Sequence, residues 1–247
     1  MSEKNQIEKT PAPVVSAFVD AVKSTRNTFS KMYSDSAEKI FLQEYGFAQM
    51  QAGGNPKLSQ CDPTSVKNAL IQVALTGITL NPARAFAYLV PRNGKCCLDL
   101  SYQGMIDLMV RSGSVKAMSG NVIFDNEKYE YKEGSNPILE HYPELNREMK
   151  EGKCLAAYCI ATLASGEKQA FLLGRNEIMK HKAVSPGSSS NYSPWNGDFW
   201  QSMYIKTVIR YAYKFLPKTE KGDQLIEILN NSNNVSFERD SREIQYQ

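Results

Sequence analysis

The sequence predicts an α+β fold in which a small antiparallel β-sheet, built from hairpins, packs against several helices. Apolar residues recur at helical spacing before residue 80 and again after residue 198. Between these regions, short strand-like runs are joined by turn sequences, of which Asn93-Gly94 is the strongest. Helices on either side of a block of hairpins are typical of the α+β class.

The N-terminal part is predicted to be helical. Apolar spacing indicates one helix over residues 13–32 and a second over residues 37–50. A third helix has clear end signals, with Asp62 as N-cap, Pro63 at the first helical position and Gly77 just beyond the last turn.

The middle of the chain is predicted to hold the strands. A short helix should follow the first hairpin and should end near Gly113. The polar stretch 134–152, which contains prolines, is expected to be a loop or a short helix. The expected strands cover residues 85–91, 95–100, two segments within 115–132, 154–163 and 168–173.

The C-terminal part begins with a short helix over residues 175–182 and a polar loop over 185–194. The longest strongly patterned helix is predicted over 198–216, where Pro217 stops it, and another helix is expected near 222–230.

We expect three regions along the 247 residues. Residues 1–30 are predicted to be an N-terminal helical segment that is frayed or contacts another subunit. Residues 31–218 are predicted to be the core domain. Residues 219–247 are expected to be an acidic, partly flexible tail, with six acidic and three basic residues.

The sequence lacks the motifs that are typical of several classes of metal-binding protein and enzyme. The five cysteines and two histidines show no zinc-ligand spacing, so buried, reduced thiols are expected and no metal or cofactor. No GxSxG, GxxxxGK[ST] or GxGxxG motif is present, and no catalytic residue is predicted. No leader or membrane-length apolar run is seen, which predicts a cytoplasmic protein without membrane association.

The charge is unevenly distributed, although the net charge is only +3. Residues 84–116 hold five basic and two acidic residues, and residues 180–218 hold six basic and one acidic. Residues 120–151 hold eight acidic and four basic residues. The pattern indicates a basic surface beside acidic segments, and a clustered basic surface is typical of proteins that bind a polyanion.

The predicted helix 198–216 concentrates this charge. Lys206, Arg210 and Lys214 fall on one side at about one-turn spacing, and apolar residues cover the opposite side. Glutamate partners four residues away are missing, and Phe199 and Met203 flank the cations. Cations that follow a phosphate backbone, with aromatic rings near the bases, are typical of single-strand binding. A merely solvated basic face is the alternative.

A metal-dependent nuclease is a second alternative. Glu130 and Lys132 would share one face of a strand, and Asp99 or Asp107 would supply a second carboxylate for Mg²⁺. The acidic surroundings of Glu130 argue against this, because they repel DNA unless a metal is bound.

Several ordered motifs resemble the RecT and Red-beta family of phage single-strand annealing proteins, over roughly residues 30–220. The matching blocks are Cys61-Asp62-Pro63-Thr64-Ser65, Gly77 to Pro82, Ala87-Tyr88-Leu89-Val90-Pro91, Tyr102-Gln103-Gly104-Met105-Ile106-Asp107-Leu108 with Arg111-Ser112-Gly113, and a late block with Ser185-Pro186, Trp195, Phe199, Met203, Lys206-Thr207-Val208-Ile209-Arg210, Lys214 and Leu216-Pro217.

The resemblance implies an ATP-independent recombinase of the bacterial host cytoplasm that coats single-stranded DNA and anneals it to a complementary strand. Such proteins assemble into rings or helical filaments, with DNA in a basic groove. The implied partners are single-stranded DNA, the annealed duplex, further copies of the chain, a phage exonuclease and a host single-strand binding protein. Gln103 departs from the family, where many relatives carry lysine.

The expected DNA contacts combine this resemblance with the charge pattern. Lys206, Arg210 and Lys214 are predicted to hold phosphates, with Lys180 and Lys182 nearby. Arg92, Lys95 and Arg111 are predicted to form the opposite wall. The further candidates are Tyr102 and Gln103, together with Trp195 and Trp200, for which a core position is the alternative to base stacking. A passive single-strand or RNA cover would share these contacts without annealing strands.

Overall fold

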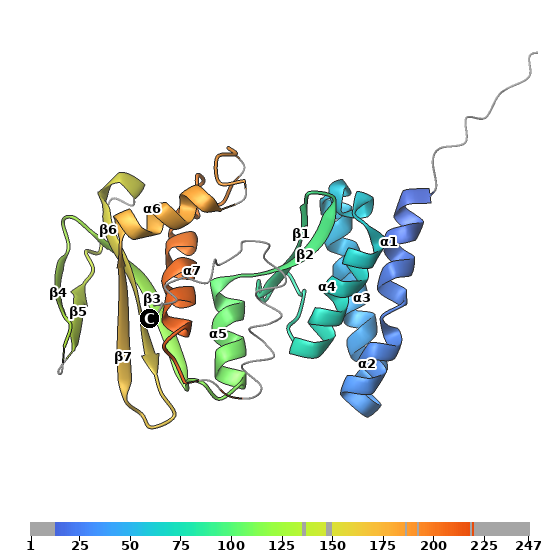
Figure 1. Cartoon of the computed structure of the whole chain (residues 1–247), viewed down its shortest axis with the longest axis horizontal. Helices are drawn as coiled ribbons and strands as arrows, with labels where there is room; N and C mark the ends of the chain where they lie inside the picture. Colours follow the sequence, from blue (N-terminus) through green and yellow to red (C-terminus); the bar gives the residue numbers. More distant parts are fainter. Residues whose placement is uncertain are drawn as a thin grey trace, which may run out of the picture. The chain divides into compact units, whose positions relative to one another are not determined.

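The computed structural model describes residues 13–134, 137–146, 150–185, 187–191, 193–217 and 219. The chain divides into two compact units, Met1–Asp99 and Leu100–Gln247, and the predicted core 31–218 spans both. The helices and hairpins expected for the α+β class are present (Figure 1). The expected helix near 222–230 and most of the tail 219–247 lie outside the described residues.

Unit 1 is a set of helices followed by one hairpin. Its elements are α1 (Pro13–Lys23), α2 (Arg26–Tyr33), the short 3-10 helix η1 (Ser34–Ser36), α3 (Ala37–Gly54), the 3-10 helix η2 (Pro56–Gln60), α4 (Pro63–Thr76), β1 (Ala87–Arg92) and β2 (Lys95–Leu100). Helix α1 packs on α4, and α2 packs on α3 and α4. Residues 13–23 of the predicted N-terminal segment thus contact other helices of the same unit.

One long helix was predicted over residues 13–32, and that prediction is wrong. The helix is interrupted at Ser24 and Thr25. The Thr25 hydroxyl donates to Val22 O at 2.7 Å, and the Ser24 hydroxyl donates to Ala21 O at 2.7 Å. Side-chain hydroxyls that bond the local backbone compete with helical hydrogen bonding, which explains a break at this pair.

The end signals of α4 and of the first hairpin are confirmed. Asp62 caps α4 by accepting from Ser65 N at 2.8 Å, and Gly77 takes the left-handed conformation after the last turn. Asn93 and Gly94 both have positive φ, as a tight two-residue hairpin requires.

Two polar side chains of α3 hold the chain that follows α4. Gln51 donates to Leu80 O at 3.0 Å and accepts from Leu89 N at 2.7 Å. Glu44 is buried and accepts from the Thr79 hydroxyl and from Leu80 N. Burial raises the pKa of Glu44, and these two hydrogen bonds lower it in part.

Unit 2 contains a three-stranded antiparallel sheet in the order β3-β6-β7 and a separate two-stranded hairpin. Its elements are α5 (Tyr102–Arg111), β3 (Ala117–Phe124), β4 (Lys128–Lys132), β5 (Ile138–Tyr142), the 3-10 helix η3 (Glu151–Lys153), β6 (Cys154–Thr162), β7 (Lys168–Gly174), α6 (Arg175–Val184) and α7 (Trp200–Tyr213). Helix α7 lies along one face of the sheet, with α5 and α6 packed against it (Figure 1).

Strand β5 corrects the prediction of a loop or short helix over 134–152. Residues Ile138–Tyr142 pair antiparallel with β4, and Glu130 lies opposite Glu140. Pro137 and Pro143 directly flank this five-residue strand. Proline lacks a donor for a sheet ladder, but at the two ends of a strand it costs no hydrogen bond within the pairing.

The β4–β5 hairpin is anchored to the sheet by a buried polar group. Glu127 is fully buried and accepts from Phe124 N at 2.7 Å, and its Oε2 lies 3.1 Å from His141 Nε2. His141 Nδ1 lies 3.2 Å from the hydroxyl of Tyr158 on β6. Each member has a polar partner, which is the condition under which burying such groups is tolerated.

The five cysteines form no disulfide, and all but Cys97 are buried, as expected for reduced thiols. Burial raises the pKa of the Cys154 and Cys159 thiols to about 12, so both stay protonated at neutral pH.

Candidate nucleic-acid interface

Helix α7 is held on the sheet by its apolar side. The residues buried on this helix are Trp200, Tyr204, Thr207, Val208, Ile209 and Ala212. Gly120 of β3 lets α7 approach the sheet closely, because a Cβ at this position would lie 2.8 Å from Cγ2 of Ile205 on α7. The amphipathic pattern that predicted this helix is confirmed, although the helix is shorter than expected at both ends.

The opposite side of α7 carries the predicted cations. Lys206 and Arg210 are half-buried, and Lys214, at the C-cap, is exposed. We call these three residues the α7 basic face. No acidic residue occurs within Trp200–Tyr213, so the helix itself offers no carboxylate to these cations. Positive charge near a helix C-terminus is also favoured by the helix dipole, which is a purely structural benefit for Arg210 and Lys214.

The imidazole ring of His181, on α6, interacts electrostatically with the α7 basic face. Its pKa is lowered first by burial and then by the positive charges of Lys214 and Arg210, and Glu177 partly opposes the shift. The two helices pack together. The structure therefore brings a titratable ring of α6 within electrostatic reach of two cations of α7.

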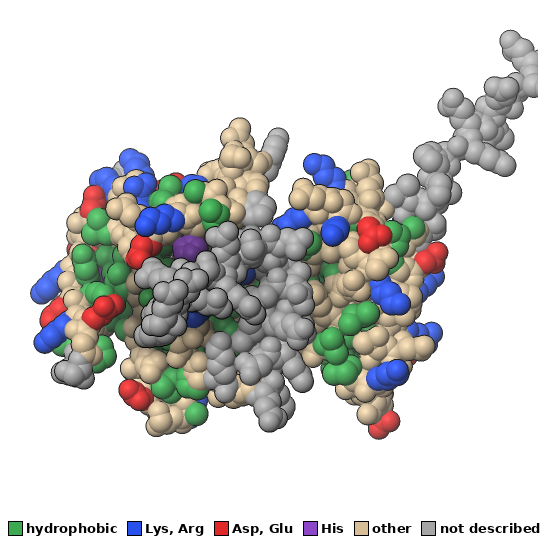
Figure 2. Space-filling model, in the orientation of Figure 1, with side chains coloured by type: hydrophobic (Ala, Val, Ile, Leu, Met, Phe, Trp, Pro, Cys, Tyr) green, Lys and Arg blue, Asp and Glu red, His purple; other side chains and the backbone are tan. Residues whose placement is uncertain are grey.

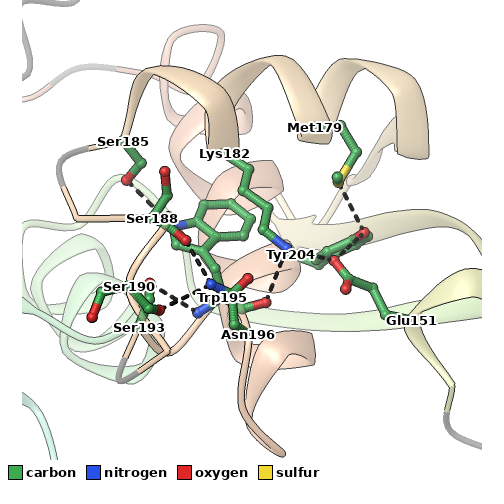
Figure 3. Close-up of polar contacts among 10 residues, drawn as sticks. All are labelled: Glu151, Met179, Lys182, Ser185, Ser188, Ser190, Ser193, Trp195, Asn196 and Tyr204. Carbon is green, nitrogen blue, oxygen red and sulfur yellow. Dashed lines mark hydrogen bonds and ion pairs between the residues drawn. The ribbon is translucent and has the colours of Figure 1, made fainter.

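Lys182 has a structural role in this chain. Its side chain is only 15% exposed, and its Nζ donates to Glu151 Oε1 at 3.1 Å and to Trp195 O at 3.2 Å (Figure 3). The Tyr204 hydroxyl donates to the same carboxylate oxygen at 3.2 Å. The prediction that Lys182 holds a phosphate does not fit these contacts, because its charge is already bound to a carboxylate. Lys180, two residues earlier, is exposed.

Trp195 and Trp200 are core residues, at 4% and 6% exposure. The Trp200 ring packs edge-on against Tyr204, with centroids 4.9 Å apart, and against Phe124 at 6.0 Å. Trp195 donates its Nε1 hydrogen to the Ser185 hydroxyl (Figure 3). Base stacking requires an accessible ring face, so the core alternative applies to both residues and the stacking prediction is corrected.

The β1–β2 hairpin of unit 1 carries Arg92 and Lys95. Arg92 forms an ion pair with Asp99 at 2.7 Å, with side-chain exposures of 25% and 19%. Lys95 is exposed directly after the Asn93-Gly94 turn. Both residues belong to unit 1 and the α7 basic face to unit 2, and their role as an opposite wall stays a prediction.

Helix α5 carries the remaining candidates. Arg111 forms an ion pair with Asp107, one turn earlier, at 2.7 Å. Gln103 is exposed, and Tyr102 is half-buried. Helix α5 packs against α7. Carboxylates therefore neutralise Arg92 and Arg111 as well as Lys182, which sequence counting of charges did not anticipate.

Phe199 was not among the predicted DNA contacts, although it flanked the cations in the sequence pattern. It directly precedes α7, and its side chain is 75% exposed, whereas the neighbouring Trp200 is buried. The signal available in the sequence was its spacing of seven and eleven residues from Lys206 and Arg210, which places it on the same side of the helix.

The residues considered for a nuclease do not gather into a metal site. Glu130 and Lys132 are exposed on β4, where basic and acidic side chains alternate (Figure 2). Asp99 is paired with Arg92, and Asp107 with Arg111. Among the described residues, no group of three His, Cys, Asp or Glu side chains is arranged to hold a metal ion.

In the part of the chain that the structure describes, no helix combines the length and the apolar character that crossing a bilayer requires.

Two curated proteins are similar in sequence. Protein RecT of Escherichia coli (strain K12) is 31% identical over 170 residues, which cover 66% of this chain and 61% of that protein. Uncharacterized protein YqaK of Bacillus subtilis (strain 168) is 27% identical over 154 residues, covering 62% of this chain and 51% of that protein. The chain thus spans between half and two thirds of the length of these relatives. The RecT family model matches residues 44–233, which is most of the chain, and the chain belongs to the RecT family.

Proposed function

We propose that this chain binds single-stranded DNA and anneals it to a complementary strand without ATP, in homologous recombination of the phage type. The observation that carries the proposal is the α7 basic face, in which Lys206, Arg210 and Lys214 line one side of a helix without acidic residues. Membership of the RecT family supports the same function.

The α7 basic face has the charge that strand annealing requires. The protein has to hold the sugar-phosphate backbone by charge while the base edges stay free to pair. Cations at one-turn spacing, about 6 Å apart along the helix, follow a backbone without reading its sequence. No covalent bond is made or broken in annealing, so the function needs no catalytic residue and no ATP.

The proposal includes assembly and partners. We infer that the chain works as a ring or helical filament of identical subunits in the cytoplasm of a bacterial cell, on single-stranded DNA and the annealed duplex. A phage exonuclease that supplies the single strand and a host single-strand binding protein are the proposed protein partners.

An annealing assay tests the function. Two complementary oligonucleotides, one with a fluorophore and the other with a quencher, are mixed with the protein without ATP, either with Mg²⁺ or with a chelator. We expect the protein to speed up quenching and a denaturing gel to show intact strands. Binding without faster pairing would leave a passive single-strand cover, and shortened strands in the Mg²⁺ sample would indicate a nuclease. Either result would contradict the proposal.

A further inference from the structure

We propose that Phe199 is a stacking platform for one nucleobase of the bound single strand, at the N-terminal end of the α7 basic face. This inference rests on the proposed function and adds a base contact to the phosphate contacts. The starting observation is that Phe199 is 75% exposed directly before a helix whose first residue, Trp200, is buried.

The exposure of Phe199 is energetically unfavourable in the isolated chain. Moving the apolar surface of a phenylalanine side chain from water into an apolar contact is favourable. Among the described residues, no aromatic ring is paired with that of Phe199, whereas Phe215 at the other end of α7 stacks on Phe171 with centroids 6.1 Å apart. The Phe199 ring is therefore available to an external flat, apolar partner.

The backbone that carries the Phe199 ring is held in place by its neighbours. Trp200 is wedged against Tyr204 and Phe124, so the backbone at the start of α7 is held in place. On the other side, Asn196 donates to Ser188 O at 2.7 Å and to Ser190 O at 3.0 Å, and Lys182 donates to Trp195 O (Figure 3). A ring carried on a fixed backbone loses only the freedom of its own side chain when a ligand binds.

The surrounding charges point to a base rather than a phosphate at this end of the helix. Lys206 is seven residues further along the same side, about 10 Å along the helix axis. The residue directly before Phe199 is the exposed Asp198, whose carboxylate repels phosphate oxygens but not an uncharged nucleobase. A strand whose phosphates lie on Lys206 and Arg210 would bring a base to the ring, and stacking on one face leaves the pairing edge free.

The test compares an oligothymidylate with an oligonucleotide of equal length that lacks bases, at several salt concentrations. The variants are Phe199→Ala, Phe199→Tyr, which keeps a ring, and Tyr142→Ala. Tyr142 is a matched control because it is an exposed aromatic residue, at 54%, on the mixed-charge hairpin of the same unit.

We expect the wild type to bind the thymidylate more tightly than the abasic strand. Phe199→Ala should reduce thymidylate affinity by roughly 5- to 150-fold, as expected for the loss of one stacked base, with abasic affinity and the salt slope unchanged. Phe199→Tyr should stay within about twofold of the wild type, and Tyr142→Ala should behave as the wild type does.

Two results would overturn the inference. One is a Phe199→Ala variant that keeps the wild-type preference for bases. The other is a variant that loses affinity equally for both oligonucleotides and sediments as a smaller species, which would assign the ring to a contact between copies of the chain. A wild type that binds neither oligonucleotide would instead refute the proposed function itself.

Discussion

Helices α6 and α7 both carry basic residues at short spacing, but the surroundings of these charges differ. Lys182 of α6 is nearly buried and bound to Glu151 and to the backbone of Trp195. Lys206, Arg210 and Lys214 line the outer side of a helix that carries no carboxylate. The comparison teaches that the number of basic residues in a segment does not give the number of charges that a polyanion can reach, because a carboxylate from elsewhere in the fold binds Lys182. Lys182 serves the structure, and the α7 basic face is the candidate for DNA.

The largest effect is expected from reversing charge on the α7 basic face. Lys206→Glu with Arg210→Glu replaces two attractions to phosphate by two repulsions, and we expect single-strand affinity to fall by roughly 100-fold or more at 0.1 M salt. Fluorescence anisotropy with a labelled oligonucleotide measures this. Wild-type affinity in a variant that still folds would break the comparison.

A substitution on α6 is expected to lower the stability of the fold. Lys182→Met removes the cation but keeps the length of the side chain, leaving the Glu151 carboxylate and the Trp195 carbonyl without it. Stability should fall by about 2 kcal/mol, and Tm by roughly 4–8 °C. Thermal unfolding followed by circular dichroism measures the change, with Lys180→Met on the exposed side of α6 as the matched control. Equal Tm values for the two variants would contradict the structural role of Lys182.

The pH dependence of DNA binding tests whether His181 of α6 interacts electrostatically with Arg210 and Lys214 of α7. Burial and the charges of Lys214 and Arg210 hold the pKa of His181 below its usual 6.5, so the ring is neutral at pH 7. A phosphate bound to these cations would partly cancel their charge, raise the pKa and cause proton uptake. Affinity should therefore rise as pH falls below about 6.5, at most tenfold per pH unit for one proton.

His181→Gln should remove most of this rise, as measured by anisotropy titrations at pH 7.5, 6.5 and 5.5. The stability of the folded chain has the opposite trend, because the unfolded chain binds the proton more readily, so folded protein is lost as pH falls through the same window. A variant that keeps the full pH dependence of binding would show that the protonated group lies elsewhere.

The smallest effect is expected on α5. Arg111 is already paired with Asp107, so Arg111→Gln should change affinity by only about twofold. Asp107→Asn removes the negative charge that is paired with Arg111 and should raise affinity slightly. The same titrations measure both. A loss with Arg111→Gln as large as that of an α7 substitution would extend the DNA contact to α5.

Local signals in the sequence predicted much of the fold. Asp62, Pro63 and Gly77 define the ends of α4, and Asn93-Gly94 defines a hairpin, because each acts through hydrogen bonds or φ angles within a few residues. Strand β5 was missed, since its five residues are enclosed by prolines and their pairing with β4 is the only evidence for a strand.

The candidate site was predictable only in part, because some of its contacts join residues that are far apart in the sequence. The α7 basic face follows from helical periodicity alone. The neutralisation of Lys182 depends on Glu151, which is 31 residues away in sequence and reaches the lysine only in the folded unit. The contrast between Phe199 and Trp200 depends on which ring faces the sheet. Pairing and burial across long sequence distances cannot be read from spacing.

The salt dependence of binding tests most directly whether the α7 basic face holds phosphates. The logarithm of single-strand affinity is measured against the logarithm of salt concentration for the wild type, for Lys206→Ala with Arg210→Ala, and for Lys182→Met. We predict a slope that is shallower by about 1.4 in the double variant, or 0.7 for each lost phosphate contact, and unchanged in Lys182→Met. Equal slopes for the wild type and the double variant would contradict the central claim.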